Sequence, residues 1–136
     1  MQTFVPYSDL KKSLQCLDYR RLGKQRVESS QIINIILTGS TGSWTNHPAV
    51  NMWRGYLPAL ISYYNLNLKE WENRGYKNIK LKPIPLRHSH FKMPPWWGGP
   101  IHASHRAALL YKDIEWYSQF GWIEEPSLNY EWPQNA

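Results

Sequence analysis

Three polar side chains near the start of the chain lie where a helix should be apolar. At about 100° per residue, Arg21, Gln25 and Glu28 fall on the same helical stripe as five aliphatic residues. Those aliphatic residues are Leu10, Leu14, Leu17, Ile32 and Ile35. Charged groups on a core-facing stripe are costly to desolvate unless they are paired or border a cleft. The middle of this helix is therefore the best candidate for a functional site.

Cations surround this stripe, and cations can hold phosphate groups. Four of them lie within seven residues, beside only two carboxylates, Asp18 and Glu28. They are Arg20, Arg21, Lys24 and Arg26. This is more positive field than local pairing needs. The alternative is that Arg21 and Glu28 form a structural pair, with the other cations solvated and a kink at Gly23 that turns the stripe outward.

A second polar cluster, His102, His105 and Arg106, stands at the start of the last predicted helix. Free backbone N–H groups there would add to the positive charge, so this is a natural phosphate site. The alternative is that His102 caps the helix and His105 lies in the core. A metal site formed with His88 and His90 is a further alternative, because imidazole is a common zinc ligand.

Aromatic residues are frequent, with eight Trp and nine Tyr in 136 residues. Flat rings can stack on nucleic-acid bases. Trp96 and Trp97 lie on a Pro-rich stretch and are candidates for a wedge or a stacking surface at a distorted base step. The alternative is that the two rings fasten the loop to the core.

The composition of the whole chain indicates a polyanionic partner. Sixteen Lys and Arg against ten Asp and Glu give a formal charge of +6, with a pI near 9.5. The single cysteine, Cys16, fits a reducing compartment. The sequence contains no apolar run long enough to span a membrane and no secretory signal pattern. We expect a single domain over residues 1–136.

Helical periodicity predicts the elements that position these residues. One helix is expected over residues 8–37 with Ser8 as its N-cap, and another from 47 to 64 with a bend or break at Pro58. A short helix over 68–74 ends at Gly75. A long loop over 80–100 precedes the last helix, 101–120, and a Trp- and Pro-rich tail, 121–136. The expected fold is therefore all-α and compact, with three main helices, long loops and an aromatic tail.

The chain resembles the small pyrimidine-dimer DNA glycosylases of the phage endonuclease V type. The resemblance rests on Tyr19-Arg20 and Arg26-Val27, within the pattern LDYRRLGKQRVE, and it extends over most of the chain. The other residues that carry it are His47, Trp53, Leu60, Ile61, Arg74-Gly75-Tyr76, Asn78-Ile79, His102-Ala103-Ser104 and Trp122.

This resemblance implies a metal-independent repair enzyme that needs no cofactor and binds damaged double-stranded DNA. Such enzymes flip out a base opposite a cyclobutane pyrimidine dimer, attack the sugar C1′ with the N-terminal α-amine, and cleave the backbone from an imine by β-elimination. Gln2 is too bulky for easy removal of the initiator Met, so the amine would belong to Met1, or to Thr3 after trimming. Arg21 stands at the position of the family's catalytic glutamate. We therefore assign Glu28 as the acid/base, with Asp18 as the second choice.

The expected catalytic residues are thus Met1 or Thr3, Glu28 and Arg21. The expected DNA-binding residues are Arg20, Lys24, Gln25, Arg26, His102, His105, Arg106, Trp96 and Trp97. Two other functions stay open, a histidine-metal nuclease and a non-catalytic DNA-binding module. We expect an intracellular monomer in the cytoplasm or at the nucleoid, with no membrane partner; whether a phage encodes it stays open.

Overall fold

The computed structural model describes residues 1–39, 42–88, 90–134 and 136, and across these residues it contains helices and no strands. The all-α fold class is therefore confirmed. The helices are α1 (Leu10–Gln15), α2 (Tyr19–Thr38), α3 (Pro48–Asn51), α4 (Leu57–Asn73), α5 (Ile101–Lys112) and α6 (Ile114–Tyr117), followed by the 3-10 turn η1 (Ser118–Phe120). None of the described helices is long and apolar enough to cross a bilayer.

The single helix predicted over residues 8–37 is wrong, because the chain forms two helices there. Asp9, and not Ser8, caps α1 by accepting a hydrogen bond from the Lys12 N–H at 2.8 Å. Asp18 then caps α2, its carboxylate accepting from the Arg21 N–H. A carboxylate at an N-cap replaces the hydrogen bond that the first turn of a helix lacks, so it starts a new helix. α2 ends at Thr38, and Gly39, with a φ of 64°, caps it.

Gly23, where the sequence allows a kink, does not interrupt α2. Gly23 lies inside α2, where that helix packs against α4. A Cβ at this position would come within 2.9 Å of the Trp71 ring. The glycine therefore allows α2 to lie close to Trp71 of α4.

The second predicted helix is divided as well. α3 ends at Asn51, and α4 begins just before Pro58, which takes a first-turn position where its missing N–H costs nothing. The separate helix predicted over 68–74 is the end of α4, and Gly75, with a φ of 89°, follows it. The last predicted helix, 101–120, breaks at Asp113, whose carboxylate caps α6 through the Trp116 N–H.

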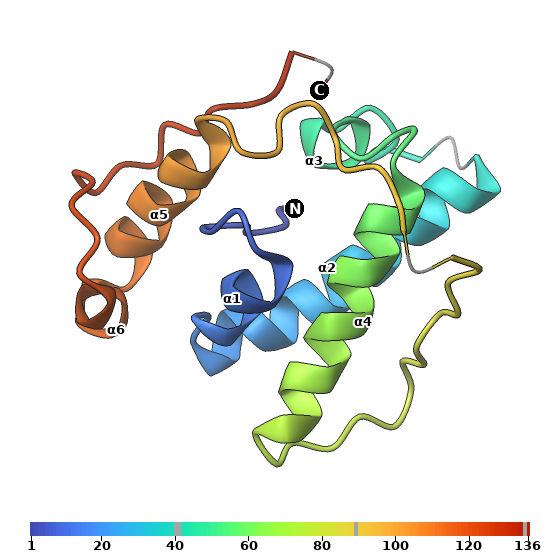
Figure 1. Cartoon of the computed structure of the whole chain (residues 1–136), viewed down its shortest axis with the longest axis horizontal. Coiled ribbons are helices and arrows are strands. Elements are labelled where there is room, and N and C mark those ends of the chain that lie inside the picture. The colour runs from blue at the N-terminus through green and yellow to red at the C-terminus, as the bar shows by residue number, and fades with distance from the viewer. Residues whose placement is uncertain (40–41, 89, 135) are drawn as a thin grey trace.

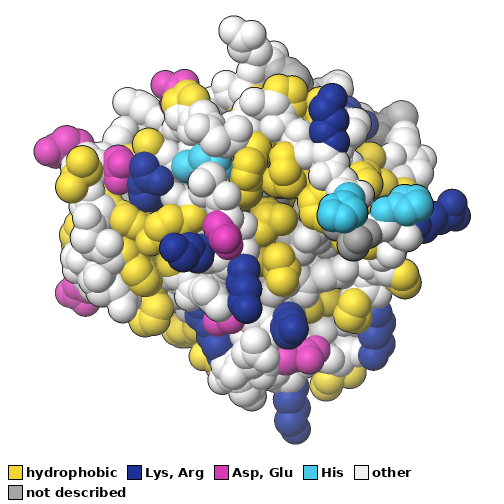
Figure 2. All heavy atoms as spheres, in the orientation of Figure 1, with side chains coloured by type: hydrophobic (Ala, Val, Ile, Leu, Met, Phe, Trp, Pro, Cys, Tyr) yellow, Lys and Arg dark blue, Asp and Glu magenta, His cyan; other side chains and the backbone are white. Residues whose placement is uncertain are grey.

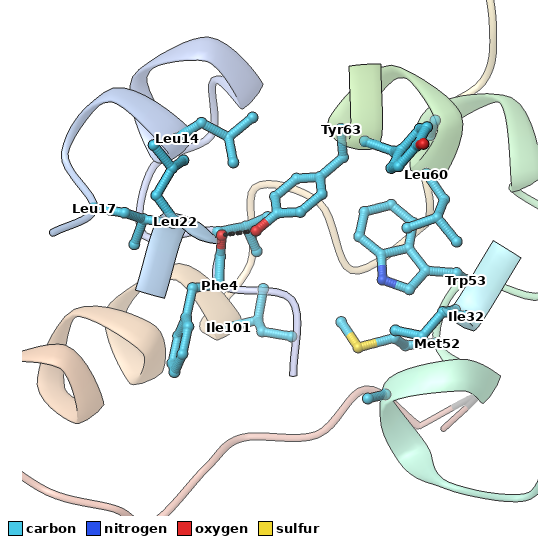
Figure 3. Close-up of a cluster of buried hydrophobic side chains, with 14 of the residues drawn as sticks. Phe4, Leu14, Leu17, Leu22, Ile32, Met52, Trp53, Leu60, Tyr63 and Ile101 are labelled. Carbon is cyan, nitrogen blue, oxygen red and sulfur yellow. Dashed lines mark hydrogen bonds between the residues drawn. The ribbon is translucent and has the colours of Figure 1, made fainter. Parts of the chain in front are cut away.

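The helices enclose the first residues of the chain. In Figure 1 the N-terminal segment lies in the middle of the molecule, between α5 on one side and α2 and α4 on the other. Figure 3 shows Phe4 among core side chains from several helices, with the Tyr63 hydroxyl bonded to its carbonyl. The described residues of the 80–100 loop form turns without a helix or strand, as predicted.

Candidate active site at the buried N-terminus

The N-terminal segment, residues 1–5, is held by side chains rather than by a sheet. The Gln2 N–H donates to the Glu28 carboxylate at 3.0 Å, and the Phe4 N–H donates to the Gln25 carbonyl oxygen at 2.8 Å. The Gln25 amide nitrogen lies 3.3 Å from the same Glu28 oxygen. Gln25 and Glu28 are thus buried on α2 because they satisfy polar backbone groups of another segment. These hydrogen bonds explain why Gln25 and Glu28 lie on a stripe of α2 that is otherwise apolar.

Two aromatic residues fix the same segment from the other side. The Tyr63 hydroxyl lies 3.0 Å from the Phe4 carbonyl oxygen and 3.1 Å from the Gln25 side-chain oxygen. The Trp53 indole donates to the Thr3 hydroxyl at 2.9 Å. Thr3 is therefore fully buried, whereas Met1, Gln2 and Phe4 line a cleft.

The two histidines of α5 also bind this segment. His105 Nδ1 accepts from the Val5 N–H at 2.9 Å, and His102 Nδ1 donates to the Val5 carbonyl at 2.6 Å. Burial lowers the pKa of both imidazoles, that of His105 to about 3. Both rings are buried and neutral. The structure therefore places them in the core and not where they could contact a phosphate, and His105 is the core residue of the alternative interpretation.

An open cleft of about 1140 Å³ lies where the N-terminal segment meets α2. Glu28 borders it with a 9% exposed fraction, and Met1 and Gln25 line it as well. The predicted cations Arg20, Arg21 and Lys24 lie on the same cleft. The structure thus brings together six of the residues that the sequence pointed to, with Met1, which carries the candidate amine, and Glu28 on one cleft.

The ion pairs of the cleft differ from the structural pair considered above. Arg21 pairs with Asp18 at 3.2 Å, and Lys24 pairs with Glu28 at 3.6 Å. Asp18 also accepts a short 2.5 Å hydrogen bond from the Tyr117 hydroxyl. Since Asp18 is occupied by a cap, a cation and a phenol, it is a weaker acid/base candidate than Glu28.

The cleft is also lined by residues to which the sequence assigned no catalytic or DNA-binding role. His47, Lys112, Tyr130 and Trp132 line it together with Glu28. The pKa of His47 is lowered by burial and then by the Met1 α-ammonium group, while Glu28 acts in the opposite direction. The pKa of Lys112 is lowered by burial, then by Arg21 and Lys24. Burial is the larger cause of both pKa shifts, and charges that share the cleft are the smaller one.

The signals for these residues were weak. His47 stands at the start of a helix, where it accepts from the Ala49 N–H at 3.0 Å, so its sequence context indicates a cap. Tyr130 and Trp132 lie on a tail without periodicity, and their position follows from tertiary contacts alone. Trp132 packs edge-on against His47 with ring centroids 6.0 Å apart.

Four other predicted DNA contacts lie away from the cleft. Arg26 binds Asn78 at 2.6 Å and covers the Trp71 ring. Arg106 forms a two-bond ion pair with Glu124. Trp96 is buried, with its indole nitrogen donating to the Met52 carbonyl at 2.9 Å, and Trp97 packs on it and on His102. The two rings thus fasten the loop to the core, as in the alternative interpretation.

A histidine metal site finds no support in the geometry. Among the residues that the structure describes, no three His, Cys, Asp or Glu side chains are grouped to hold a metal ion. His102 and His105 are committed to Val5, whereas His88 and His90 are exposed on the loop. Cys16 is buried, and burial raises the pKa of its thiol to about 12.

Comparison with known proteins gives one match. The family model described as pyrimidine dimer DNA glycosylase matches residues 1–83, which include the N-terminal segment, α2 and α4. No curated protein and no solved structure matches the chain. The matched residues contain Met1, Gln25 and Glu28, whereas Lys112, Tyr130 and Trp132 lie beyond them.

Proposed function

The chain belongs to the pyrimidine dimer DNA glycosylase family, and from this premise we propose that it is a bifunctional glycosylase and AP lyase whose nucleophile is the Met1 α-amine. It is a DNA repair glycosylase, so its substrate is DNA. The observation that carries the proposal is the 3.0 Å hydrogen bond from the Gln2 N–H to Glu28. This bond holds the candidate carboxylate one residue from the amine, at the same cleft.

The proposed reaction begins when the unprotonated amine attacks C1′ of a nucleotide in a cyclobutane pyrimidine dimer. The N–C1′ bond forms, and the glycosidic bond breaks with its electron pair leaving on the base. Loss of the amine proton and opening of the C1′–O4′ bond give an imine. Removal of a C2′ proton then breaks the C3′–O bond by β-elimination. Glu28 stabilises the sugar cation and carries the protons.

The other residues of the cleft have supporting roles in this proposal. Arg20, Arg21 and Lys24 hold phosphates beside the reacting sugar. Met1 is preferred over Thr3, because Thr3 is buried and trimming to it would remove the Gln2 contact with Glu28. We also propose that one chain acts as a monomer, with residues 1–136 as a single domain and without a metal.

Borohydride trapping tests this proposal. The substrates are a duplex with one site-specific thymine dimer, an abasic duplex and an undamaged duplex, all in chelator. A covalent adduct on the dimer duplex, mapped by mass to Met1, is the expected result. An adduct on the abasic duplex alone would keep the lyase and reject the dimer as the substrate. No adduct on any duplex would reject amine catalysis, and cleavage abolished by chelator would favour the metal nuclease.

A further inference from the structure

The positive charge of this protein is concentrated on one loop outside the cleft. The basic loop, residues 76–95, contains five Lys and Arg and no Asp or Glu. The remainder of the chain has eleven Lys and Arg against ten Asp and Glu, a net charge of +1. The loop therefore carries +5 of the total charge of +6. Its cations are Lys77, Lys80, Lys82, Arg87 and Lys92.

These cations are free to bind an external anion. All five are exposed, and so are His88 and His90. Within the described part of the chain, none of the five forms an ion pair. Figure 2 shows Lys, Arg and His side chains along the right edge of this view, where no acidic side chain is visible. A solvated surface usually mixes both signs, so an unpaired run of one sign favours binding of a polyanion.

The described part of the loop is fixed to the helices although it has no regular structure. Asn65 of α4 binds the backbone of Ile84 twice, accepting from its N–H at 2.9 Å and donating to its carbonyl at 2.8 Å. The Tyr64 hydroxyl donates to the Lys82 carbonyl at 2.8 Å. These bonds use backbone groups and leave the lysine side chain outside. The loop is thus held in place with its cations outward, which lowers the entropy cost of binding.

The start of the loop is fastened in the same way. Arg26 of α2 donates to Asn78 at 2.6 Å, and the Asn78 amide donates to the Leu81 carbonyl at 2.6 Å. Arg26, which the sequence suggested as a phosphate contact, therefore acts by holding the loop. Tyr76, the first residue of the loop, lines the cleft. The basic loop thus leads away from the rim of the candidate active site.

The loop follows the length of α4, as Figure 1 shows. It leaves the C-terminal end of this helix at Asn73 and reaches Trp96, which is bonded to Met52 before the helix begins. Seventeen residues of helix are about 25 Å long. Duplex DNA rises about 3.4 Å per base pair, so this length corresponds to roughly seven base pairs.

We propose that the basic loop is a second DNA-binding surface, which holds the phosphates of undamaged duplex flanking the nucleotide in the cleft. The proposal takes the identity of the polyanion from the proposed function, since a DNA glycosylase meets DNA on both sides of its lesion. Because the surface offers point charges without a base-reading element, its contacts are independent of sequence and of damage.

The test measures binding of the full chain to an undamaged 20-base-pair duplex across a salt series. A variant that combines four loop substitutions should bind the duplex tenfold or more weakly at low salt. The substitutions are Lys80→Gln, Lys82→Gln, Arg87→Gln and Lys92→Gln. The slope of log K against log salt should fall by about 0.9 for each lost phosphate contact. The control is a double variant, Lys11→Gln with Lys69→Gln, at two exposed lysines on α1 and α4. It is compared with a second double variant, Lys80→Gln with Lys82→Gln, which removes the same amount of charge from the loop.

Equal weakening by the two double variants would overturn the proposal, because net charge would then explain the effect. An unchanged salt slope would overturn it as well, as would loop-dependent binding to anionic lipid vesicles in place of the duplex. Trapping on a short abasic duplex at saturating protein separates this proposal from the proposed function. Loop variants should still form the covalent adduct on this duplex. If the amine mechanism is wrong, wild type should form no adduct there, while its salt slope on the undamaged duplex stays as predicted.

Discussion

His105 accepts a hydrogen bond from the backbone N–H of Val5 at 2.9 Å and is therefore required in its neutral form. Its pKa is lowered to about 3 by burial and by the neighbouring His102. A free histidine titrates near 6.5, so the unfolded chain binds a proton between pH 6.5 and 3 that the folded chain does not. The stability associated with neutral His105 is complete above pH 6.5 and is lost as the pH falls.

The free energy of unfolding should consequently decrease by up to about 1.4 kcal/mol per pH unit below pH 6 on account of this residue. Chemical denaturation from pH 4 to 8 measures the slope. His105→Asn offers an oxygen acceptor in place of the ring nitrogen and does not titrate in this range, so the variant should have a shallower slope. His47 and His102, whose pKa values are also lowered, add to the slope in wild type and variant alike. Identical slopes in variant and wild type would contradict this assignment.

Glu28→Gln should remove catalysis while preserving the site. The amide keeps an oxygen that can accept from the Gln2 N–H, and it loses the charge and the titrating proton. We expect a loss of a hundredfold or more in single-turnover strand cleavage, with DNA affinity within a factor of three of wild type. Glu124→Gln, which removes a carboxylate paired with Arg106 outside the cleft, is the matched control. Full activity of Glu28→Gln would rule out its acid/base role.

Gly23→Ala should destabilise the protein despite the better helix propensity of alanine. The new Cβ would lie 2.9 Å from the Trp71 ring, and this ring also stacks with Tyr76 at 4.3 Å and lies against Arg26. Overpacking costs about 1–3 kcal/mol, against a propensity gain of about 1 kcal/mol. Urea denaturation measures the difference. Adding Trp71→Leu to Gly23→Ala should recover part of the loss caused by the alanine; if it does not, the clash is not the cause.

Tyr117→Phe should reduce stability through Asp18. The phenol donates to the buried Asp18 carboxylate at 2.5 Å, and Asp18 caps α2. Removing a donor to a buried charged acceptor costs about 1.5–3 kcal/mol. Thermal unfolding of this variant should be compared with that of Tyr111→Phe, because Tyr111 is 60% exposed. Equal melting temperatures for the two variants would argue against a structural role for the Asp18 hydrogen bond.

The sequence predicted the helix faces better than the helix ends. Periodicity identified Gln25 and Glu28 as anomalous, and both are buried beside the N-terminal segment. It missed the break before Asp18, because a capping carboxylate within a periodic stretch looks the same as a surface residue. A core position for His105 was one of two open interpretations, but the partner of His102 and His105 was not predictable, since Val5 is about a hundred residues away. Local patterns carry no information on such contacts.

The hydrogen bond between Val5 and His105 also limits when the N-terminal segment can be fully fixed during synthesis of the chain. It joins residues 100 positions apart, and the contact cannot form until the ribosome has made α5. A nascent chain that ends at residue 83 has Glu28 and Gln25 but lacks the partner that holds Val5. Closing so long a loop is a slow step in folding. An unfinished chain of this length therefore contains the side chains that hold Gln2, Thr3 and Phe4, and it lacks both histidines that fix Val5.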